Sequence, residues 1–594
     1  MFSVPLSGTK QNLFAHKTVE NIEKIRHSLA HLMASAVLEF YPKAKLGMGP
    51  AVDNGFYYDF QLQKPLEEKD LVEIEAKIKE LISQKLKFEK KNITKRVAKK
   101  LFAVQPYKLE ILKDLPGDTV SIFQTGEFVD LCKGPHIKST KEITPNSFKL
   151  TKTAGAYWKG SEKNKMLTRI YGLAFETEKE LTNYLNMLVE AEKRDHRKLG
   201  KELDLFCFSD LVGPGLPLYT AKGVAIKEEL QKEVERICRN YGFEKVSTPS
   251  LAKIDLFETS GHAKKFNDEL FRVSSPKGHK FVLKPVQCPH HTQIYASKPR
   301  SYRDLPIRYM ESDKQYRAEK PGEIGGLNRV YAITVEDGHT FCTKEQVKDE
   351  IKTLVNIIKD FYTSMGLWGN HWISLSTRGK DFSNYIGEKK DWDLCEKILQ
   401  EVSNEMGLNA KKCPGEAALY GPKLDFMFRD AIGKEIQIPT VQIDFATPKR
   451  FNLTYTDKDG SEKNPVMVHR AILGSYERFL ALAIEHFAGA FPVWLSPIQV
   501  AIIPISEKQN DYAKKVETEI KNAGIRVEFK NENETLGKKI RSAEMQKIPY
   551  LLIVGDKEIS ANAVSVRERG KGDLGQSSLN DFINKIKKEI VLRN

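Results

Sequence analysis

The sequence has no apolar run close to the roughly 20 residues that a membrane-spanning helix needs, and this absence excludes a membrane-embedded protein. The first residues, MFSVPLSGTKQNLF, lack the basic start and long apolar stretch of a signal peptide. They also lack the arginines of a transit peptide. We therefore expect a soluble cytoplasmic protein with no membrane partner.

Paired cysteines are also missing. The seven cysteines are odd in number, scattered and without any CxxC pair, at positions 132, 207, 238, 288, 342, 395 and 413. This pattern excludes a disulfide framework and favours reduced thiols, some of which could bind a metal.

Length and charge set the broad class. A chain of 594 residues is too long for one core, and its length suggests about three to five domains. Lys and Arg number 94 against 79 Asp and Glu, a net charge of +15. That excess suits a polyanion such as nucleic acid, although a solvated lysine-rich surface would explain it equally well.

The chain contains no internal repeat and no low-complexity tract, and its segments alternate between helical and strand patterns. We predict a multidomain α+β protein. Its expected parts are a leader at 1–20, an α+β domain at 21–177, an exposed connecting helix at 178–202, a large block at 203–497 and a compact α/β domain at 498–594.

The stretch RHSLAHLMA places His27 and His31 four residues apart, on one face of an expected helix. About a hundred residues later, FVDLCKGPH supplies Asp130, Cys132 and His136. Imidazole and thiolate are the ligands that zinc prefers, whereas histidine is also suited to metal-free acid–base chemistry near neutral pH. The local sequence leaves both possibilities open.

A second set of candidate ligands lies in the large block. Cys288 occurs in LKPVQCPHH, His339 in VEDGHTF and His469 in VMVHRAILGSYERF. One cysteine and two histidines would make a three-ligand zinc site with an open fourth position, which is the arrangement of a catalytic site.

Arginines surround this second set. YRAE carries Arg317 and Glu319 on an expected strand, and Arg329 follows the loop KPGEIGG on the expected returning strand. GSYERF places Arg478 at the start of an apolar helix, and Pro249 ends an upstream helix–strand run. Arginines in these positions can hold the phosphates and the purine face of a nucleotide.

Together, these elements resemble motifs 1, 2 and 3 of the class II aminoacyl-tRNA synthetases. Within that class the chain resembles the threonyl-tRNA synthetase family from about residue 20 to its end. The stretches that carry the likeness are CPHH, EDGHTFC, YGPKLDF, TVQIDF, VMVHRAILGSYERF, AGAFPVWLSP, RHSLAHLMA, FVDLCKGPH, TAGAYWKG, RIYG and VGDKE…VSVRER. Bacterial members usually begin with a small TGS domain, and we expect this chain to start after it.

The resemblance implies a fold and a reaction. The fold is an antiparallel-sheet catalytic core at 203–497, an α+β editing domain at 21–177 and a C-terminal anticodon-binding domain at 498–594. The reaction is activation of L-threonine by ATP to threonyl-adenylate, followed by transfer to tRNA(Thr). The family works as a homodimer, with one Zn²⁺ per subunit and Mg²⁺ with ATP.

The resemblance also implies roles for individual residues of the core. The zinc ligands would be Cys288, His339 and His469; the ATP-binding residues Arg317, Glu319, Arg329, Gln442 and Arg478; the threonine-binding residues Asp337, Tyr420 and Gln437; and the catalytic residues Arg317, Arg478 and Lys423.

Outside the core, the resemblance implies a proofreading site and an anticodon site. Serine keeps the hydroxyl of threonine, and a missing methyl gives only about 1–3 kcal/mol of discrimination, so a second, hydrolytic site is needed. That site would consist of His27, His31, Lys108, Asp130, Cys132 and His136, and we favour its metal-free form. The anticodon would be read by Glu558, Arg567 and Arg569.

The chain departs from the usual family pattern at Gln287, His290, Tyr331, Ile333 and Val335. Three alternatives therefore stay open: a serine or proline synthetase of the same class, a non-catalytic RNA-binding regulator descended from a synthetase, and a metal hydrolase built on the HxxxH region. Amino-acid-dependent pyrophosphate exchange tests the first, loss of exchange with retained tRNA binding would favour the second, and the two appended RNA-type domains argue against the third.

Overall fold

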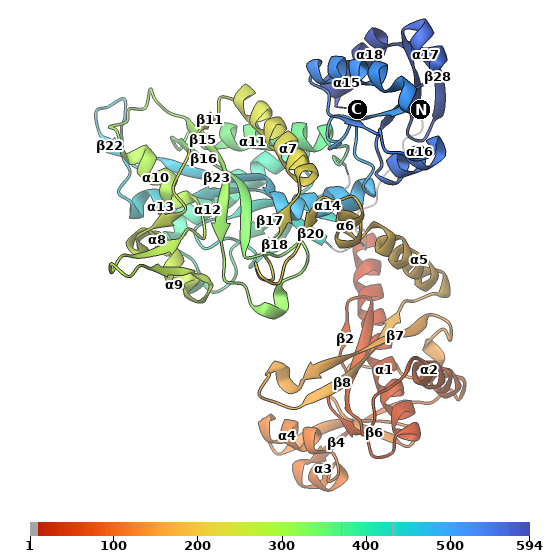
Figure 1. The fold of residues 1–594 in the computed structure, drawn as a ribbon. Coiled ribbons are helices and arrows are strands. Elements are labelled where there is room, and N and C mark those ends of the chain that lie inside the picture. Colours follow the sequence, from red (N-terminus) through yellow and green to blue (C-terminus); the bar gives the residue numbers. More distant parts are fainter. Residues whose placement is uncertain (1–9, 370, 430–432, 434, 594) are drawn as a thin grey trace. The chain divides into compact units, whose positions relative to one another are not determined.

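The structure is a computed structural model that describes residues 10–369, 371–429, 433 and 435–593 (Figure 1). By its internal contacts the chain divides into two compact units, Met1–Leu188 and Val189–Asn594. Residues 1–9 of the expected leader lie outside the described part, and Lys10 already belongs to the first helix. Among the described residues, no helix is both long and apolar enough to cross a bilayer.

The first unit is α+β and contains two antiparallel sheets, one with strand order β1-β3-β8-β7 and β2 paired to β3, the other β4-β5-β6. Its elements are α1 (Lys10–Phe40), β1 (Lys45–Leu46), β2 (Ala51–Val52), β3 (Gly55–Gln61), α2 (Glu68–Ser83), β4 (Phe88–Thr94), α3 (Lys95–Leu101), α4 (Pro106–Asp114), β5 (Thr119–Thr125), β6 (Phe128–Leu131), β7 (Phe148–Tyr157), β8 (Met166–Ala174) and α5 (Glu178–Arg194).

Helix α1 forms the centre of this unit. Leu29, Met33 and Val37 recur every fourth residue and are fully buried against β3 and α2. The same helical spacing holds His27 and His31 on one face, with ring centroids 5.3 Å apart, as the sequence predicts.

The second unit begins inside α5 and is built on an eight-stranded sheet, with strand order β11-β15-β16-β23-β20-β19-β17-β18. Its elements up to residue 487 are α6 (His196–Glu202), β9 (Phe206–Cys207), β10 (Leu218–Tyr219), α7 (Ala221–Asn240), β11 (Glu244–Lys245), β12 (Leu251–Ala252), α8 (Ile254–Ser260), α9 (His262–Lys265), β13 (Arg272–Ser274), β14 (Lys280–Leu283), α10 (Cys288–Ala296), β15 (Ile307–Tyr316), β16 (Ala332–Cys342), α11 (Val347–Ser364), β17 (His371–Thr377), α12 (Lys389–Glu405), β18 (Lys411–Pro414), β19 (Lys423–Arg429), β20 (Glu435–Asp444), α13 (Ala446–Arg450), β21 (Tyr455–Thr456), β22 (Glu462–Lys463), β23 (Val466–Ser475) and α14 (Tyr476–Phe487).

The two faces of this sheet have different environments. All neighbouring strands are antiparallel except the pairs β11–β15 and β17–β18. Helices α11 and α14 pack on β16 and β23 from one side, where Val466, Val468 and Ile472 join the main hydrophobic core. Because side chains alternate along a strand, Met467 and His469 lie on the opposite face.

The C-terminal part, from 498 onward, is the predicted α/β domain. Its sheet has the order β25-β24-β26-β27-β28, with α15 and α18 packed on one face and α16 on the other. The elements are β24 (Val500–Pro504), α15 (Asn510–Asn522), β25 (Val527–Phe529), α16 (Leu536–Met545), β26 (Tyr550–Val554), α17 (Asp556–Ala561), β27 (Ala563–Glu568), β28 (Gly572–Ser578) and α18 (Leu579–Leu592). Strand β28 was not expected from the sequence, because its glycines and polar residues give no strand pattern.

The multidomain α+β architecture with an antiparallel core sheet is confirmed, but two local expectations were wrong. The connecting helix is broken at Asp195, whose side chain accepts the backbone N–H of Arg197 and caps α6. Arg317 and Arg329 do not lie on strands. They lie in the loop between β15 and β16, where a turn joins the backbones of Gly325 and Arg329 and interrupts the pairing.

Candidate functional sites

The sheet register brings the three predicted zinc ligands together. His339 on β16 and His469 on β23 are directly opposed, and Gln442 on β20 is opposed to His469. Cys288 enters from the first residue of α10. One ligand atom from each of Cys288, His339 and His469 lies within 4.8 Å of the others, and all three residues are buried.

Hydrogen bonds orient both histidine rings. His291 Nε2 lies 3.1 Å from Glu311 Oε2, and His291 Nδ1 lies 2.7 Å from His339 Nδ1. The Nδ1–H of His339 therefore donates to His291, and its Nε2 keeps a lone pair that has no partner among the described residues. His469 Nε2 donates to Asp444 over 3.0 Å, which leaves the lone pair on Nδ1.

This arrangement fits a bound metal. A buried ring nitrogen without a partner is costly in a folded protein unless a ligand satisfies it. Burial raises the pKa of the Cys288 thiol, so a metal ion would have to displace its proton. One thiolate and two imidazoles make a donor set that suits zinc, and each imidazole is oriented by a hydrogen bond at its other ring nitrogen.

Polar residues line the space beside this triad. The ring of Tyr420 stacks on His469 with centroids 4.7 Å apart, and its hydroxyl donates to Gln442 Oε1 over 2.9 Å. Asp337 Oδ1 lies 3.9 Å from His339 Nε2, and burial raises the pKa of Asp337. His262, which the sequence analysis missed, lies buried with its ring 6.3 Å from that of Tyr420.

A second residue that sequence reasoning missed is Asp425 on β19. Its buried carboxylate accepts hydrogen bonds from Gln437 Nε2 (2.6 Å), Thr440 Oγ1 (2.9 Å), Ser376 Oγ (2.7 Å) and the ammonium of Lys423. Thr440 in turn bonds to Gln442, so one chain of hydrogen bonds joins Lys423 and Gln437 to Tyr420. Asp425 lies in the quoted stretch YGPKLDF, but no local signal separates it from a surface acid.

The predicted nucleotide-binding arginines gather at the loop between β15 and β16. Arg478, in the first turn of α14, donates from Nε to the Asn328 carbonyl over 3.3 Å. Partial burial, together with the charges of Arg317 and Arg329, lowers the pKa of Arg478. Arg329 pairs with Glu319 at 2.6 Å. The structure therefore collects three cationic groups that could meet a polyphosphate.

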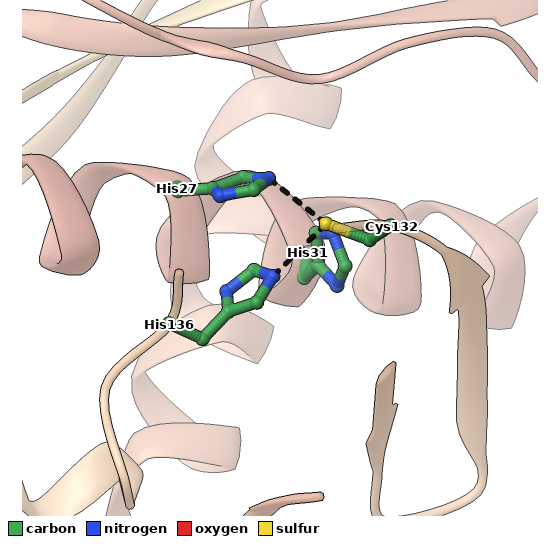
Figure 2. A group of neighbouring side chains, drawn as sticks. All are labelled: His27, His31, Cys132 and His136. Carbon is green, nitrogen blue, oxygen red and sulfur yellow. Dashed lines mark hydrogen bonds between the residues drawn. The ribbon is translucent and has the colours of Figure 1, made fainter. Parts of the chain in front are cut away.

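The first unit holds the other cluster of candidate residues. His27 and His31 on α1 face Cys132 and His136, which follow β6 (Figure 2). Cys132 Sγ lies 3.3 Å from both His27 Nε2 and His136 Nε2. His27 Nδ1 lies 3.1 Å from the Pro135 carbonyl.

These contacts form a network with one consistent direction. His27 donates to Pro135 O and accepts from the Cys132 thiol. Ser28 Oγ accepts the N–H of Ile137 and donates to His136 Nδ1 over 3.0 Å, so His136 Nε2–H donates to the sulfur. Burial raises the pKa of Cys132 to about 11 and lowers the pKa values of His27, His31 and His136. The cluster is therefore electrically neutral near pH 7.

A buried ion pair lies next to this cluster. Lys108 Nζ lies 2.6 Å from Asp130 Oδ1, and both side chains are 3% exposed. Tyr58 donates its hydroxyl to Asp130 Oδ2 over 2.6 Å, and His31 Nε2 lies 3.8 Å from the same oxygen. The structure thus brings all six predicted residues of this site together, and it adds Ser28 and Tyr58.

The three predicted anticodon residues have different surroundings. Glu558 in α17 accepts the backbone N–H of Gly555, and the side chain of Arg567 on β27 is half-buried. Arg569 donates to the carbonyls of Phe491 (2.6 Å), Ala490 (3.1 Å) and Lys547. The guanidinium of Arg569 therefore donates its hydrogen bonds to backbone carbonyls, and none of these carbonyls belongs to the C-terminal sheet.

Three family models match the chain. The tRNA synthetase class II core domain (G, H, P, S and T) matches residues 271–487, the anticodon binding domain matches 499–589, and the threonyl and alanyl tRNA synthetase second additional domain matches 120–171. The core match includes all three residues of the triad and the three arginines. The fold and this site define a class II aminoacyl-tRNA synthetase, which is an aminoacyl-tRNA ligase.

Similar proteins of known function identify the family within this class. Threonine–tRNA ligase of Thermotoga petrophila is 44% identical over 96% of this chain and 88% of its own length, and that of Gloeobacter violaceus is 45% identical over 94% and 91%. A crystal structure of the RNA binding domain of threonyl-tRNA synthetase from Cryptosporidium parvum Iowa II matches with a TM-score of 0.63 and 34% identity, over 66% of this chain and 98% of that one. The chain belongs to the threonine–tRNA ligase family.

Proposed function

We propose that this chain activates L-threonine with ATP, transfers it to tRNA(Thr) and hydrolyses Ser-tRNA(Thr) that forms by error. The observation that carries the proposal is the buried triad of Cys288, His339 and His469, on the core sheet of a chain that belongs to the threonine–tRNA ligase family. The supporting observation is the separate histidine–cysteine cluster in the first unit.

Cys288, His339 and His469 would hold one Zn²⁺ per subunit. When bound, the ion supplies open coordination positions for the amino group and the hydroxyl of threonine. The chain's own residues then complete the selection. Asp337 and Tyr420 lie at the triad and would receive the ammonium, and the network around Asp425 holds Lys423 and Gln437 in place. Valine has the shape of threonine but offers no oxygen, so a polar group of the site would be left unsatisfied.

The arginines would bind and orient ATP. Arg317 would hold the α-phosphate, Arg478 and Arg329 would meet the far phosphates, and Glu319 would face the adenine edge. Their positive charges, with the Mg²⁺ that accompanies ATP, stabilise the negative charge that develops during adenylate formation. Gln442, which is bonded to Tyr420, would line the junction between the amino acid and the nucleotide.

The cluster of the first unit would act without a metal. Its thiol and the imidazoles of His27 and His136 already satisfy one another, whereas His31 Nδ1, like His339 Nε2 of the triad, has no partner among the described residues. Neutral imidazoles can position a water and accept its proton at physiological pH. Asp130 and Lys108 would fix the polar wall against which the misattached serine is recognised.

The remaining assignments extend the same proposal. The editing domain would occupy 21–177, the catalytic domain 203–497 and the anticodon-binding domain 498–594, where Arg567 is the residue best placed to meet an unpaired base. The enzyme would work as a homodimer in the cytoplasm.

The decisive experiment is amino-acid-dependent pyrophosphate exchange with threonine, serine and proline, together with the zinc content of the purified protein. We expect threonine to give the highest kcat/KM and about one zinc per chain, and we expect Cys288→Ser to lose both. Faster exchange with serine or proline would show a different synthetase. Retained tRNA binding without any exchange would show a regulator instead.

A further inference from the structure

His196, the first residue of α6, connects two elements of the nucleotide site although it belongs to neither. Its side chain is buried, and α6 packs against α14 (Figure 1). Nδ1 lies 2.8 Å from Glu485 Oε1 on α14, and Nε2 accepts the backbone N–H of Leu327 over 3.1 Å. The ring therefore bridges the arginine-bearing helix and the loop between β15 and β16.

The loop is shaped to receive this ring. Gly326 has a φ of +51°, and a Cβ built on it would lie only 2.3 Å from His196 Nε2. The next side chain, Leu327, is 1% exposed and belongs to the main hydrophobic core. Gly326 and Leu327 are therefore held at one point, against a single histidine.

The residues that follow this anchor are the ones that would meet ATP. The carbonyl of Asn328 accepts the Nε–H of Arg478, and Arg329 pairs with Glu319. A shift of the loop at Leu327 would therefore move Arg329 directly and would release the hydrogen bond that orients Arg478. Losing the positions of these two guanidiniums would weaken the contacts to the far phosphates.

We propose that His196 is a positioning residue for ATP: by accepting the N–H of Leu327 while anchored on Glu485, it holds the loop of Arg329 in its nucleotide-binding form. This inference rests on the proposed function. His196 is the first residue of α6, which follows α5. The residue that it holds, Leu327, lies two residues before Arg329, which would bind phosphate.

Three substitutions test which contact matters. His196→Gln keeps an acceptor at the position of Nε2, His196→Asn keeps only a group that can reach Glu485, and His196→Ala removes both. We expect the Mg-ATP dissociation constant and the KM for ATP in threonine-dependent exchange to rise about tenfold in the Ala and Asn variants and less than threefold in the Gln variant. The KM for threonine should stay within twofold.

The matched control is Lys198→Ala, an exposed residue of the same helix, which should leave ATP binding unchanged. Thermal unfolding of each variant separates a folding defect from a positioning defect. Wild-type affinity for Mg-ATP in folded His196→Ala, or equal losses in the Gln and Asn variants, would overturn the inference. Mg-ATP binding is measured directly, so an absence of threonine-dependent exchange in the wild type would refute only the proposed function.

Discussion

At the scale of residues, two histidine–cysteine clusters with nearly the same chemistry differ in what their atoms contact. In the first unit, the thiol of Cys132 already has three hydrogen-bonding partners, His27, His136 and the N–H of Gly134. Each cluster also holds a buried ring nitrogen that has no partner among the described residues, His31 Nδ1 in the first unit and His339 Nε2 in the triad. The two clusters therefore share their ligand types and an unpartnered ring nitrogen, and what distinguishes the first cluster is the thiol of Cys132, which is already hydrogen-bonded.

Removing His27 should abolish proofreading while leaving synthesis intact. His27→Ala takes away the acceptor of the Cys132 thiol and one wall of the cluster, so we expect Ser-tRNA(Thr) to accumulate about tenfold or more when serine is supplied. Threonine charging should stay within twofold of the wild type. Glu23→Ala, an exposed change one turn earlier on α1, is the control, and unchanged Ser-tRNA levels in His27→Ala would contradict the assignment.

The same cluster should make the first unit sensitive to acid. Burial lowers the pKa values of His27, His31 and His136 below the usual 6.5, so below that pH the unfolded chain binds more protons than the folded one. The stabilisation is fully present above about pH 6.5 and is lost as the pH falls. Each such histidine then lowers the free energy of unfolding by about 1.4 kcal/mol per pH unit.

Hydrogen exchange of the full chain between pH 7.5 and 5.5, corrected for its intrinsic pH dependence, checks this expectation. Protection of α1 should fall, whereas α15 should keep its protection because residues 498–594 contain no histidine. Equal changes in the two helices would show that the buried histidines do not govern the acid response.

At the scale of elements, strand register and one buried acid organise the pocket. Asp425 on β19 holds Lys423 on its own strand and Gln437 and Thr440 on β20. Because four donors converge on one carboxylate, its charge, and not only its shape, maintains this arrangement.

Asp425→Asn should therefore lower kcat/KM for threonine activation by about 10- to 100-fold, since a charged hydrogen bond contributes about 1.5–3 kcal/mol. The change keeps the volume of the side chain, so the fold should persist and the melting temperature should fall by only a few degrees. Glu435→Gln, an exposed carboxylate at the start of β20, is the control. Wild-type exchange in Asp425→Asn would show that the network is not needed.

At the scale of the whole second unit, arginines from the C-terminal domain hold the segment that follows α14. Arg569 binds the carbonyls of Ala490 and Phe491, and Arg526 binds those of Ser496 (2.9 Å) and Trp494 (2.6 Å). This geometry indicates that Arg569 connects the anticodon-binding part to the end of the catalytic part. The prediction that Arg569 reads the anticodon stays untested.

Arg569→Ala removes the guanidinium from the carbonyls of Ala490 and Lys547, which costs about 1–3 kcal/mol, whereas the Phe491 carbonyl keeps the hydroxyl of Ser496. We expect faster proteolytic cleavage near residue 497 and slower charging, with unchanged threonine-dependent exchange. Arg567→Ala, on β27 two residues before Arg569, should instead raise the KM for tRNA(Thr) without increasing cleavage. If Arg569→Ala weakened tRNA binding with no change in cleavage, the anticodon role would be favoured.

The sequence by itself determined the long amphipathic helices and the apolar strands of the C-terminal domain, because periodic burial is a local property of the chain. This is why α7, α14 and the alternating strands and helices of the C-terminal domain match their predictions, whereas α1 begins inside the expected leader and β28 was missed. It also supplied the candidate ligands, which a family resemblance connected over about 180 residues.

Only the tertiary structure decided which atoms meet. The register of β16, β20 and β23 opposes His339, His469 and Gln442, and the turn between Gly325 and Arg329 keeps Arg329 off the returning strand. Asp425, His196 and the occupied guanidinium of Arg569 gave no local signal, because their roles come from partners at sequence separations that no periodicity encodes. Hydrogen-bond direction and burial depend on those partners, so they exist only in the folded chain.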